Sequence, residues 1–209
     1  MNKMNAEKMC AVILAAGTSS RMGELKQLLP LNGKPLLEHV IRQALDNGFT
    51  DIFTVVGHEA ERIRANITIT DERHHWLINE EYAYGQSTSV KKALMHIKGD
   101  YPHAMILLGD LPFIKNDTVE KVRLSGAGLC STHKAPFLVR PVHLGEAGHP
   151  VFIGNITTQL VEHLEGDAGF KSIKNHFAMV ELIETDDDGV NFDLDTSEDY
   201  KIASEKSRR

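Results

Sequence analysis

Short apolar runs alternate along this chain with longer segments in which apolar residues recur at helical spacing. Short runs bounded by turn residues are typical of buried strands, and apolar positions three or four apart are typical of helices. We therefore expect strands at 11–14, 51–56, 75–78, 104–108, 137–141, 150–153, 179–183 and 190–194. The same pattern predicts helices at 35–47, 59–65, 87–97, 117–122, 156–164, 168–175 and after residue 196. This alternation predicts an α/β fold, with helices on both faces of a mostly parallel, mixed central sheet.

Residues that favour helix starts mark several of these boundaries. Ser87 or Ser89 is a candidate N-cap of one helix, and Asn116 or Asp117 of the next. Thr196 is predicted to cap the final helix. These side chains can accept hydrogen bonds from the first free N–H groups of each helix, so the predicted elements are locally consistent.

Composition and charge narrow the class of protein. The chain has 209 residues, 42% of them hydrophobic and 25% charged, and no repeat or linker divides it. We expect one domain over 1–209, with a core at about 9–203. The net charge of −6, without any basic run, predicts no nucleic-acid partner.

The sequence also points to a cytoplasmic protein. No stretch approaches the roughly 18 apolar residues of a membrane span, and the opening MNKMNAEK lacks a signal-peptide core. We therefore expect no membrane partner. The two cysteines, Cys10 and Cys130, form no CxxC pair and are interpreted as buried reduced thiols.

The most informative stretch runs from residue 11 to 37. Its apolar strand ends in the small residues Ala15-Ala16-Gly17-Thr18-Ser19, which allow backbone N–H groups to approach a ligand closely. Arg21 and Lys26 follow, and two cations beside such a loop favour a polyphosphate. The alternative is an ordinary strand–loop–helix turn with two solvated cations. The glycine spacing fits neither a Walker A loop nor a GxGxxG fingerprint.

Carboxylates at two other places suggest a metal site. Asp110 directly follows the apolar run AMILL, and a carboxylate at the end of a buried strand needs a cation partner. Mg²⁺ binds one or two carboxylates together with phosphates and waters. The alternative role of Asp110 is to cap the next turn. Asp193 and Asp195 lie at the end of the predicted strand at 190–194, and we expect only one of them to face the site.

The opening motif resembles the signature LAAGxSxRMGxxK of the nucleotidyltransferases. Here it reads LAAGTSSRMGELK over 14–26, with every fixed position present. The continuation LLPLNGKPLLEHVI is similar to the MobA-like branch that attaches a nucleotide to molybdopterin. The resemblance extends from about residue 11 to 200. It implies a three-layer Rossmann-like nucleotidyltransferase fold and a Mg-dependent transferase.

Motifs of that family imply roles for particular residues. GDLPFI resembles GDxPfi, whose aspartate, here Asp110, holds the catalytic Mg²⁺. DLDTSEDY is similar to DIDTPEDL, with Ser197 in place of proline, and favours Asp195 as a metal ligand, with Asp193 as its rival. The implied catalytic residues are Arg21, Lys26 and Asp110. The implied nucleotide-binding residues are Leu14, Ala15, Ala16, Gly17, Ser19, Arg21, Lys26, Gly57, Asn79, Gly85, Ser87, Ser89 and Asp110.

Two further segments resemble the acceptor side of the family's site. RPVHLGEAGHPVFIG is similar to RPxxxGxxGHPvlf, which implies that Gly148, His149 and Pro150 bind the pterin-side substrate. His149 could equally fix the loop. Gly166-Asp167-Ala168-Gly169 resembles GDxGaR and adds Asp167, although Phe170-Lys171 replaces the usual Ala-Arg. An anion contact there would fall to a lysine, which lacks the bidentate geometry of arginine.

The resemblance implies transfer of CMP from CTP to the terminal phosphate of molybdopterin or the molybdenum cofactor. The pterin dinucleotide would serve molybdenum hydroxylases such as xanthine dehydrogenase, whose apoenzyme is a possible partner. The AAG opening, GDLPFI and GHP favour the cytidylyl over the guanylyl branch. One alternative is transfer to another phosphorylated acceptor, such as a sugar phosphate or a methylerythritol-type alcohol. The other is a non-catalytic module that holds and delivers the finished cofactor.

Overall fold

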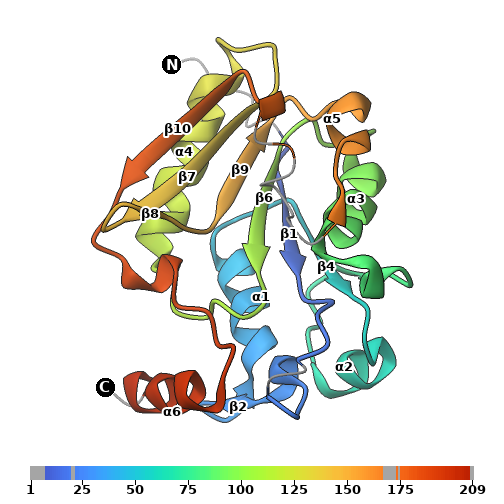
Figure 1. Cartoon of the computed structure of the whole chain (residues 1–209), viewed down its shortest axis with the longest axis vertical. Helices are drawn as coiled ribbons and strands as arrows, with labels where there is room; N and C mark the ends of the chain where they lie inside the picture. The colour runs from blue at the N-terminus through green and yellow to red at the C-terminus, as the bar shows by residue number, and fades with distance from the viewer. Residues whose placement is uncertain (1–7, 20–21, 167–172, 174, 208–209) are drawn as a thin grey trace.

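The computed structural model describes residues 8–19, 22–166, 173 and 175–207. Its centre is one mixed sheet with strand order β10-β7-β9-β6-β1-β4-β5, and β8 pairs with β7 (Figure 1). The strands are β1 (Cys10–Leu14), β4 (Asp51–Val56), β5 (His74–Ile78), β6 (Ala104–Leu108), β7 (Phe137–His143), β8 (Glu146–Ala147), β9 (Val151–Gly154) and β10 (Met179–Glu184). The predicted α/β class with a mostly parallel, mixed sheet is confirmed.

Helices cover both faces of this sheet. They are α1 (Leu36–Asp46), α2 (Ala60–Asn66), α3 (Gln86–Ile97), α4 (Asn116–Cys130), α5 (Thr158–Glu162) and α6 (Ser197–Lys206). Short 3-10 turns lie at η1 (Lys26–Leu28), η2 (Tyr82–Tyr84) and η4 (Asp188–Val190). Within the described residues, none of the helices is both long and apolar enough to cross a membrane.

Strand β1 separates two hydrophobic cores because its side chains alternate between the two faces. Ala11 and Ile13 pack in one core with residues of α1, α2 and α4. Cys10, Val12 and Leu14 pack in the other core with residues of α3 and α5. All five side chains are buried, which explains why the strand reads as a continuous apolar run. The result is the expected three-layer arrangement.

The register of the central strands decides where a ligand can bind. β1 lies between β4 and β6, parallel to both, so that Leu14 pairs with Val55 on one side and with Leu108 on the other. The carboxyl ends of β1 and β6 therefore meet at the same edge of the sheet. Ligands of open α/β sheets bind beyond such ends.

The C-terminal helix packs against an early segment of the chain. A small hairpin, β2 (Pro30–Leu31) and β3 (Lys34–Pro35), lies beside α6 at the lower end of Figure 1. Leu31 and Leu36 form a small core with Leu194 and Ala203. The hydroxyl of Tyr200 donates to the carbonyl oxygen of Pro30 at 2.6 Å. This packing brings the segment before α6 next to the loop that follows β1.

The strand predicted at 190–194 does not form. The chain makes the 3-10 turn η4 there, and no strand is assigned from 191 to 196. Val190 and Leu194 are both buried, but in two different cores, so their spacing does not reflect one face of a sheet. The expectation that only one of Asp193 and Asp195 faces the site therefore has no basis in a strand, because no strand forms there and residues two apart in a strand share a face.

Two predicted helix starts also need correction, whereas the third is confirmed. Gly85 precedes α3, and Ser87 and Ser89 lie buried inside that helix instead of capping it. Helix α4 begins after Lys115 and runs to Cys130, eight residues beyond the predicted end at 122. Neither Asn116 nor Asp117 is its N-cap. Thr196 does cap α6, in a capping box with Asp199.

Most of the helix predicted at 168–175 lies outside the described residues. The helix predicted at 156–164 is shorter than expected and begins after Thr157, whose side chain accepts from the N–H of Leu160. A hydroxyl acceptor at this position satisfies one of the free N–H groups of the first turn. The short helix therefore begins at a local sequence signal.

Candidate active site

The ends of β1 and β6 approach each other unusually closely. The N–H of Gly109 donates to the carbonyl oxygen of Leu14 at 2.9 Å. A Cβ atom at position 109 would lie 2.9 Å from that of Ala15, a distance that real Cβ contacts do not show. Gly109 is therefore required for the first loop and the loop carrying Asp110 to lie side by side.

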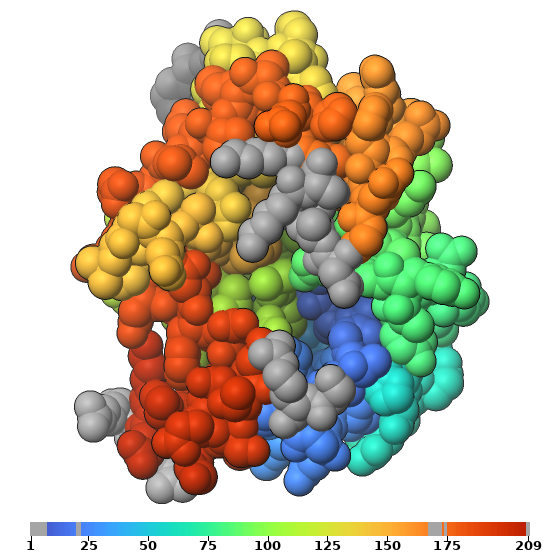
Figure 2. All heavy atoms as spheres, viewed as in Figure 1, coloured from blue at the N-terminus to red at the C-terminus, as the bar shows by residue number. Residues whose placement is uncertain are grey.

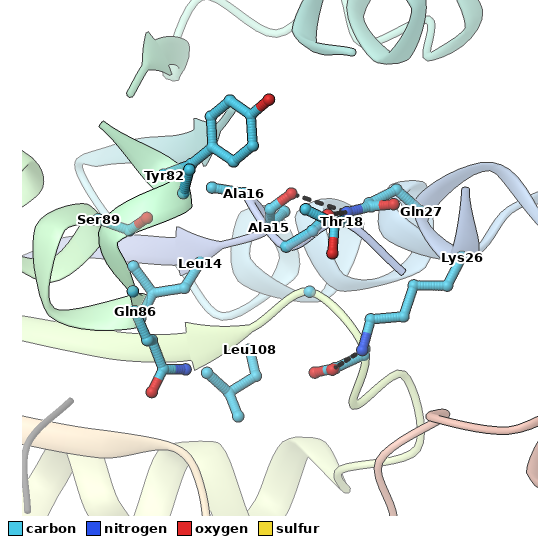
Figure 3. A pocket seen from close by; sticks show the side chains of 15 residues that line it. Leu14, Ala15, Ala16, Thr18, Lys26, Gln27, Tyr82, Gln86, Ser89 and Leu108 are labelled. Atoms are coloured by element: carbon cyan, nitrogen blue, oxygen red, sulfur yellow. Dashed lines mark hydrogen bonds and ion pairs between the residues drawn. The ribbon is translucent and has the colours of Figure 1, made fainter. Parts of the chain in front are cut away.

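A cavity of about 380 Å³ opens at this edge of the sheet. Figure 2 shows this face hollowed between the blue N-terminal segment and the red C-terminal segment. Small side chains of the first loop form one wall, and the start of α3 forms another (Figure 3). The lining residues are Leu14, Ala15, Ala16, Gly17, Thr18, Lys26, Gln27, Tyr82, Ala83, Gly85, Gln86, Ser89, Leu108, Gly109 and Asp110.

Lys26 lies between two carboxylates at one end of this cavity. Its Nζ is 2.5 Å from Asp110 Oδ2 and 2.8 Å from Asp195 Oδ1. Burial lowers the pKa of Lys26, but attraction to Asp110 and Asp195 outweighs it, so the pKa is raised. The side chain, 15% exposed, is therefore a fixed ammonium ion at neutral pH.

Asp195 reaches this point through a backbone contact. The N–H of Leu194 donates to the carbonyl oxygen of Asp110 at 3.2 Å, which joins the two carboxylate-bearing segments. The pKa of the neighbouring Asp193 is raised, first by burial and then by repulsion from Asp195. Asp110 and Asp195, 85 positions apart in the sequence, thus meet at one edge of the sheet.

The two carboxylates fit a divalent cation that also binds a phosphate. Both point an oxygen at the same position, now taken by the Lys26 ammonium. Among the described residues no group of three or more His, Cys, Asp or Glu side chains could hold a metal ion by itself. Mg²⁺ does not require such a group, because it commonly binds one or two carboxylates and takes its other ligands from phosphates and water.

Some of the predicted nucleotide-binding residues line the cavity and others do not. Eight line the cavity, among them the loop residues Leu14 to Gly17, Lys26, Gly85, Ser89 and Asp110. Ser19 instead borders a neighbouring cavity of about 470 Å³ on the other side of the loop. Gly57 packs under the ring of Tyr82, where a Cβ atom would lie 2.5 Å from the Tyr82 Cβ. Arg21 lies outside the described residues.

Asn79, Ser87 and Ser89 form the support beneath the α3 wall. Asn79 Nδ2 donates to Thr88 Oγ1 at 2.9 Å and to Ser89 Oγ at 3.0 Å, and its Oδ1 accepts from the N–H of Glu81. Ser87 Oγ donates to the carbonyl oxygen of Glu165. Asn79 and Ser87 are not part of the cavity lining, so in this structure they position the wall from behind.

The predicted acceptor residues Gly148, His149 and Pro150 are not part of that lining either. A Cβ atom at position 148 would lie 2.5 Å from the carbonyl oxygen of Val190, so glycine is required for this packing. The N–H of His149 donates to the same oxygen at 2.9 Å. Burial, together with the nearby positive charge of Arg140, lowers the pKa of His149 to about 4. Asp167, the fourth predicted acceptor residue, lies outside the described residues.

Sequence reasoning missed Gln27 and Tyr82 as lining residues. Gln27 is the clearest case, since it is only 2% exposed and its side-chain amide donates hydrogen bonds to carbonyl oxygens of the first loop (Figure 3). Its signal was a single polar residue between Lys26 and the apolar residues LLPL. Tyr82 lies in the η2 turn, and only tertiary packing brings its side chain over the end of β1.

Comparison with known proteins gives a consistent result over most of the chain. A family model for the MobA-like NTP transferase domain matches residues 11–180. Molybdenum cofactor cytidylyltransferase of Escherichia coli is 29% identical over 93% of this chain and 95% of its own length. Bifunctional protein GlmU of Marinobacter nauticus is 38% identical over 52% of this chain. The match covers 24% of that protein, so this chain corresponds to about a quarter of it.

Solved structures show the same fold. Rv0371c from Mycobacterium tuberculosis H37Rv superimposes with a TM-score of 0.76 and 24% sequence identity, covering 97% of this chain and 100% of that one. Another structure of Rv0371c, a complex with manganese, gives a TM-score of 0.71 at 23% identity, covering 95% of this chain and 98% of that one.

Proposed function

The chain belongs to the MobA-like NTP transferase family. We propose that it transfers CMP from CTP to molybdopterin or its molybdenum-loaded form. The acceptor is the terminal phosphate of the pterin, and the products are a pterin dinucleotide and pyrophosphate. The choice of nucleotide and acceptor is supported by the similarity to the Escherichia coli cytidylyltransferase over nearly the whole length of both proteins.

One observation carries the chemistry: Lys26 and two carboxylates converge beside a loop of small residues. In nucleotidyl transfer, an acceptor oxygen forms a bond to the α-phosphorus while the bond to the β-phosphate oxygen breaks. Both reactants are anions, so the protein must position them and neutralise their charge. Lys26 supplies a buried positive charge. The backbone N–H groups of the loop up to Ser19 are proposed to bind the phosphates, except that of Ala15, which donates to the carbonyl oxygen of Val55 at 2.8 Å.

We propose that Asp110 and Asp195 hold a Mg²⁺ ion during the reaction. Such an ion would supply positive charge to the phosphate oxygens around the α-phosphorus. The carboxylates keep this charge at the cavity edge, and Lys26 then contacts the β- and γ-phosphates instead of Asp110. Arg21 is proposed as a second phosphate contact, as the family motif implies.

The acceptor is proposed to approach from the side of β7 and β9. Gly148, His149 and Pro150 lie at the start of β9, on the sheet beyond β6. The low pKa of His149 makes its ring neutral at pH 7, so it can exchange hydrogen bonds with a pterin without adding charge. Asp167 remains a proposed contact of the same substrate.

The direct test is pyrophosphate release by the purified protein. Molybdopterin is supplied as acceptor with Mg²⁺ and, in separate reactions, CTP, GTP or ATP. We expect release with CTP and formation of a pterin dinucleotide of matching mass. In Asp110→Asn, loss of a metal-binding carboxylate should lower the rate by about a hundredfold or more. The matched control is Asp100→Asn, an exposed carboxylate, which should retain the wild-type rate.

The other outcomes separate the alternatives. Release with GTP or ATP but not CTP would keep the chemistry and overturn the choice of base. Release only when a hexose 1-phosphate replaces molybdopterin would identify a sugar-phosphate transferase. Tight binding of molybdopterin dinucleotide, without pyrophosphate release in the presence of any of these acceptors, would indicate a delivery module instead of an enzyme.

A further inference from the structure

Three consecutive carbonyl groups of the first loop accept hydrogen bonds from other groups of the protein. Gln27 Nε2 donates to the carbonyl oxygens of Ala15 at 2.9 Å and of Gly17 at 3.0 Å. The backbone N–H of His58 donates to the carbonyl oxygen of Ala16 at 3.4 Å. None of these three oxygens is therefore directed at a ligand, although all three residues line the cavity.

The direction of each carbonyl fixes the direction of the next N–H group. In a planar trans peptide the C=O and the N–H point in opposite directions. Because Gln27 holds the oxygens of residues 15 and 17, the N–H groups of Ala16 and Thr18 point away from Gln27. A set of N–H groups with the same orientation is a binding site for an anion.

The orientation of the Gln27 amide is itself fixed. Its Oε1 accepts from Ser19 Oγ at 3.2 Å, and Ser19 Oγ accepts in turn from the N–H of Lys26 at 3.1 Å. The NH₂ end must therefore face the two loop carbonyls. This buried amide uses both of its N–H donors and its oxygen, which leaves no part of it for a ligand.

We propose that Gln27 is a positioning residue for the phosphates: it holds the loop carbonyls away from the cavity so that the loop N–H groups face the anion. This inference rests on the proposed function in taking the anion to be a triphosphate. Without the amide, the oxygens of Ala15 and Gly17 are released beside the cavity, where they repel phosphate oxygens. The loss should therefore fall on anion affinity more than on folding.

The test measures binding of inorganic tripolyphosphate with Mg²⁺ by calorimetry, in parallel with CTP. Gln27→Met keeps the length of the side chain but removes its donors, and should weaken tripolyphosphate binding by about tenfold or more. Gln27→Glu places an oxygen where a donor is needed and should weaken it further. Ser19→Ala removes only the group that orients the amide, so a loss of about two- to fivefold is expected.

Gln43→Met is the matched control. Gln43 also donates its amide to a backbone carbonyl, that of Ile114, but it lies on α1 away from the loop. Its tripolyphosphate affinity should equal that of the wild type. In turnover, Gln27→Met should raise the KM for nucleotide about tenfold while the KM for the acceptor and kcat change much less. A purely structural role would alter all three.

The outcomes distinguish this proposal from the proposed function. Suppose that the wild-type protein binds tripolyphosphate, and that the loss of affinity is largest in Gln27→Glu, smaller in Gln27→Met and smallest in Ser19→Ala. Gln27 then has the proposed role even if no transfer to molybdopterin occurs. If Gln27→Met binds tripolyphosphate as the wild type does, the inference is wrong even if transfer occurs. Absence of tripolyphosphate binding by the wild type would also overturn it. If Gln27→Met fails to fold, Ser19→Ala decides between these outcomes.

Discussion

At the scale of single residues, the position of Lys26 has the clearest consequences. Its ammonium lies between Asp110 and Asp195, where a metal ion bound by both carboxylates would have to be. Two cations cannot share this position, because their repulsion at such short range is strong. Metal binding by the free protein should therefore be weak, and nucleotide should strengthen it by drawing Lys26 towards the phosphates.

Removal of the Lys26 charge should separate metal binding from turnover. In Lys26→Met we expect the affinity for Mn²⁺ in the absence of nucleotide to rise by about tenfold, while pyrophosphate release falls by about a hundredfold. Electron paramagnetic resonance of bound Mn²⁺ measures the first quantity. Lys34→Met, whose ammonium is half exposed near Glu38, is the control. Unchanged or weaker Mn²⁺ binding would show that the ammonium does not compete with the metal.

The two C-terminal aspartates should differ in importance. Asp195 forms an ion pair with Lys26. The pKa of Asp193 is instead raised, first by burial and then by repulsion from Asp195. We expect Asp195→Asn to lower the transfer rate by about tenfold or more, and Asp193→Asn to change it by less than about threefold. The measurement is steady-state pyrophosphate release at saturating CTP. The reverse order would make Asp193 the proposed metal ligand.

At the scale of elements, α4 depends on residues far from it in the sequence. Its N-terminus is capped by Asp187, which is fully buried and accepts from the N–H of Lys115 at 2.8 Å and from Thr118 Oγ1 at 2.7 Å. Near its other end, Gly126 faces the ring of Phe152 on β9. The helix therefore continues past its predicted end because the glycine fits against a neighbouring strand.

Two glycines of α4 provide a matched pair of substitutions. A Cβ atom at position 126 would lie 2.4 Å from the Phe152 ring, whereas one at position 128 meets nothing within 4 Å. We expect Gly126→Ala to lower the free energy of unfolding by about 1–3 kcal/mol. Gly128→Ala should raise it by about 0.5–1 kcal/mol, because alanine favours a helix. Urea unfolding of both variants tests this, and a stabilised Gly126→Ala would contradict the packing described here.

At the scale of the whole molecule, two histidines link stability to pH. Burial lowers the pKa of both His74 and His149 to about 4, with repulsion from His75 and Arg140 as the second causes. The unfolded chain therefore binds protons before the folded protein does as the pH falls below about 6.5. The contribution of these residues is fully present above pH 6.5 and is lost between pH 6.5 and 4.

This acid sensitivity can be measured by urea unfolding at several pH values. Each histidine can add a slope of up to about 1.4 kcal/mol per pH unit between pH 4 and 6.5. His74→Gln, which keeps a polar group beside Thr54, should reduce the slope in that range. The exposed His96→Gln is the control and should leave the curve unchanged. An equal slope in wild type and His74→Gln would show that His74 does not cause the sensitivity.

Features that depend on neighbours along the chain could be predicted from the order of the amino acids. The apolar runs located the central strands, the Thr196–Asp199 pair located the start of α6, and the signature of residues 14–26 indicated the family, now shown by the match over 11–180. The alternation of strand-like and helix-like segments also predicted the helices on both faces of the sheet. These features follow from local periodicity and capping, which act over a few residues.

Which distant groups meet depends on the folded chain as a whole. The convergence of Lys26 with Asp110 and Asp195 depends on the packing of α6 against the β2–β3 hairpin, and the irregular path through 190–196 replaced the expected strand. The side chain of Gln27 is held by its hydrogen bonds to carbonyl oxygens of the loop that precedes it. The cap of α4 comes from a residue about 70 positions later. Hydrogen bonds and packing across such separations leave no periodic signal in the chain, because each one is satisfied only when the whole fold is formed.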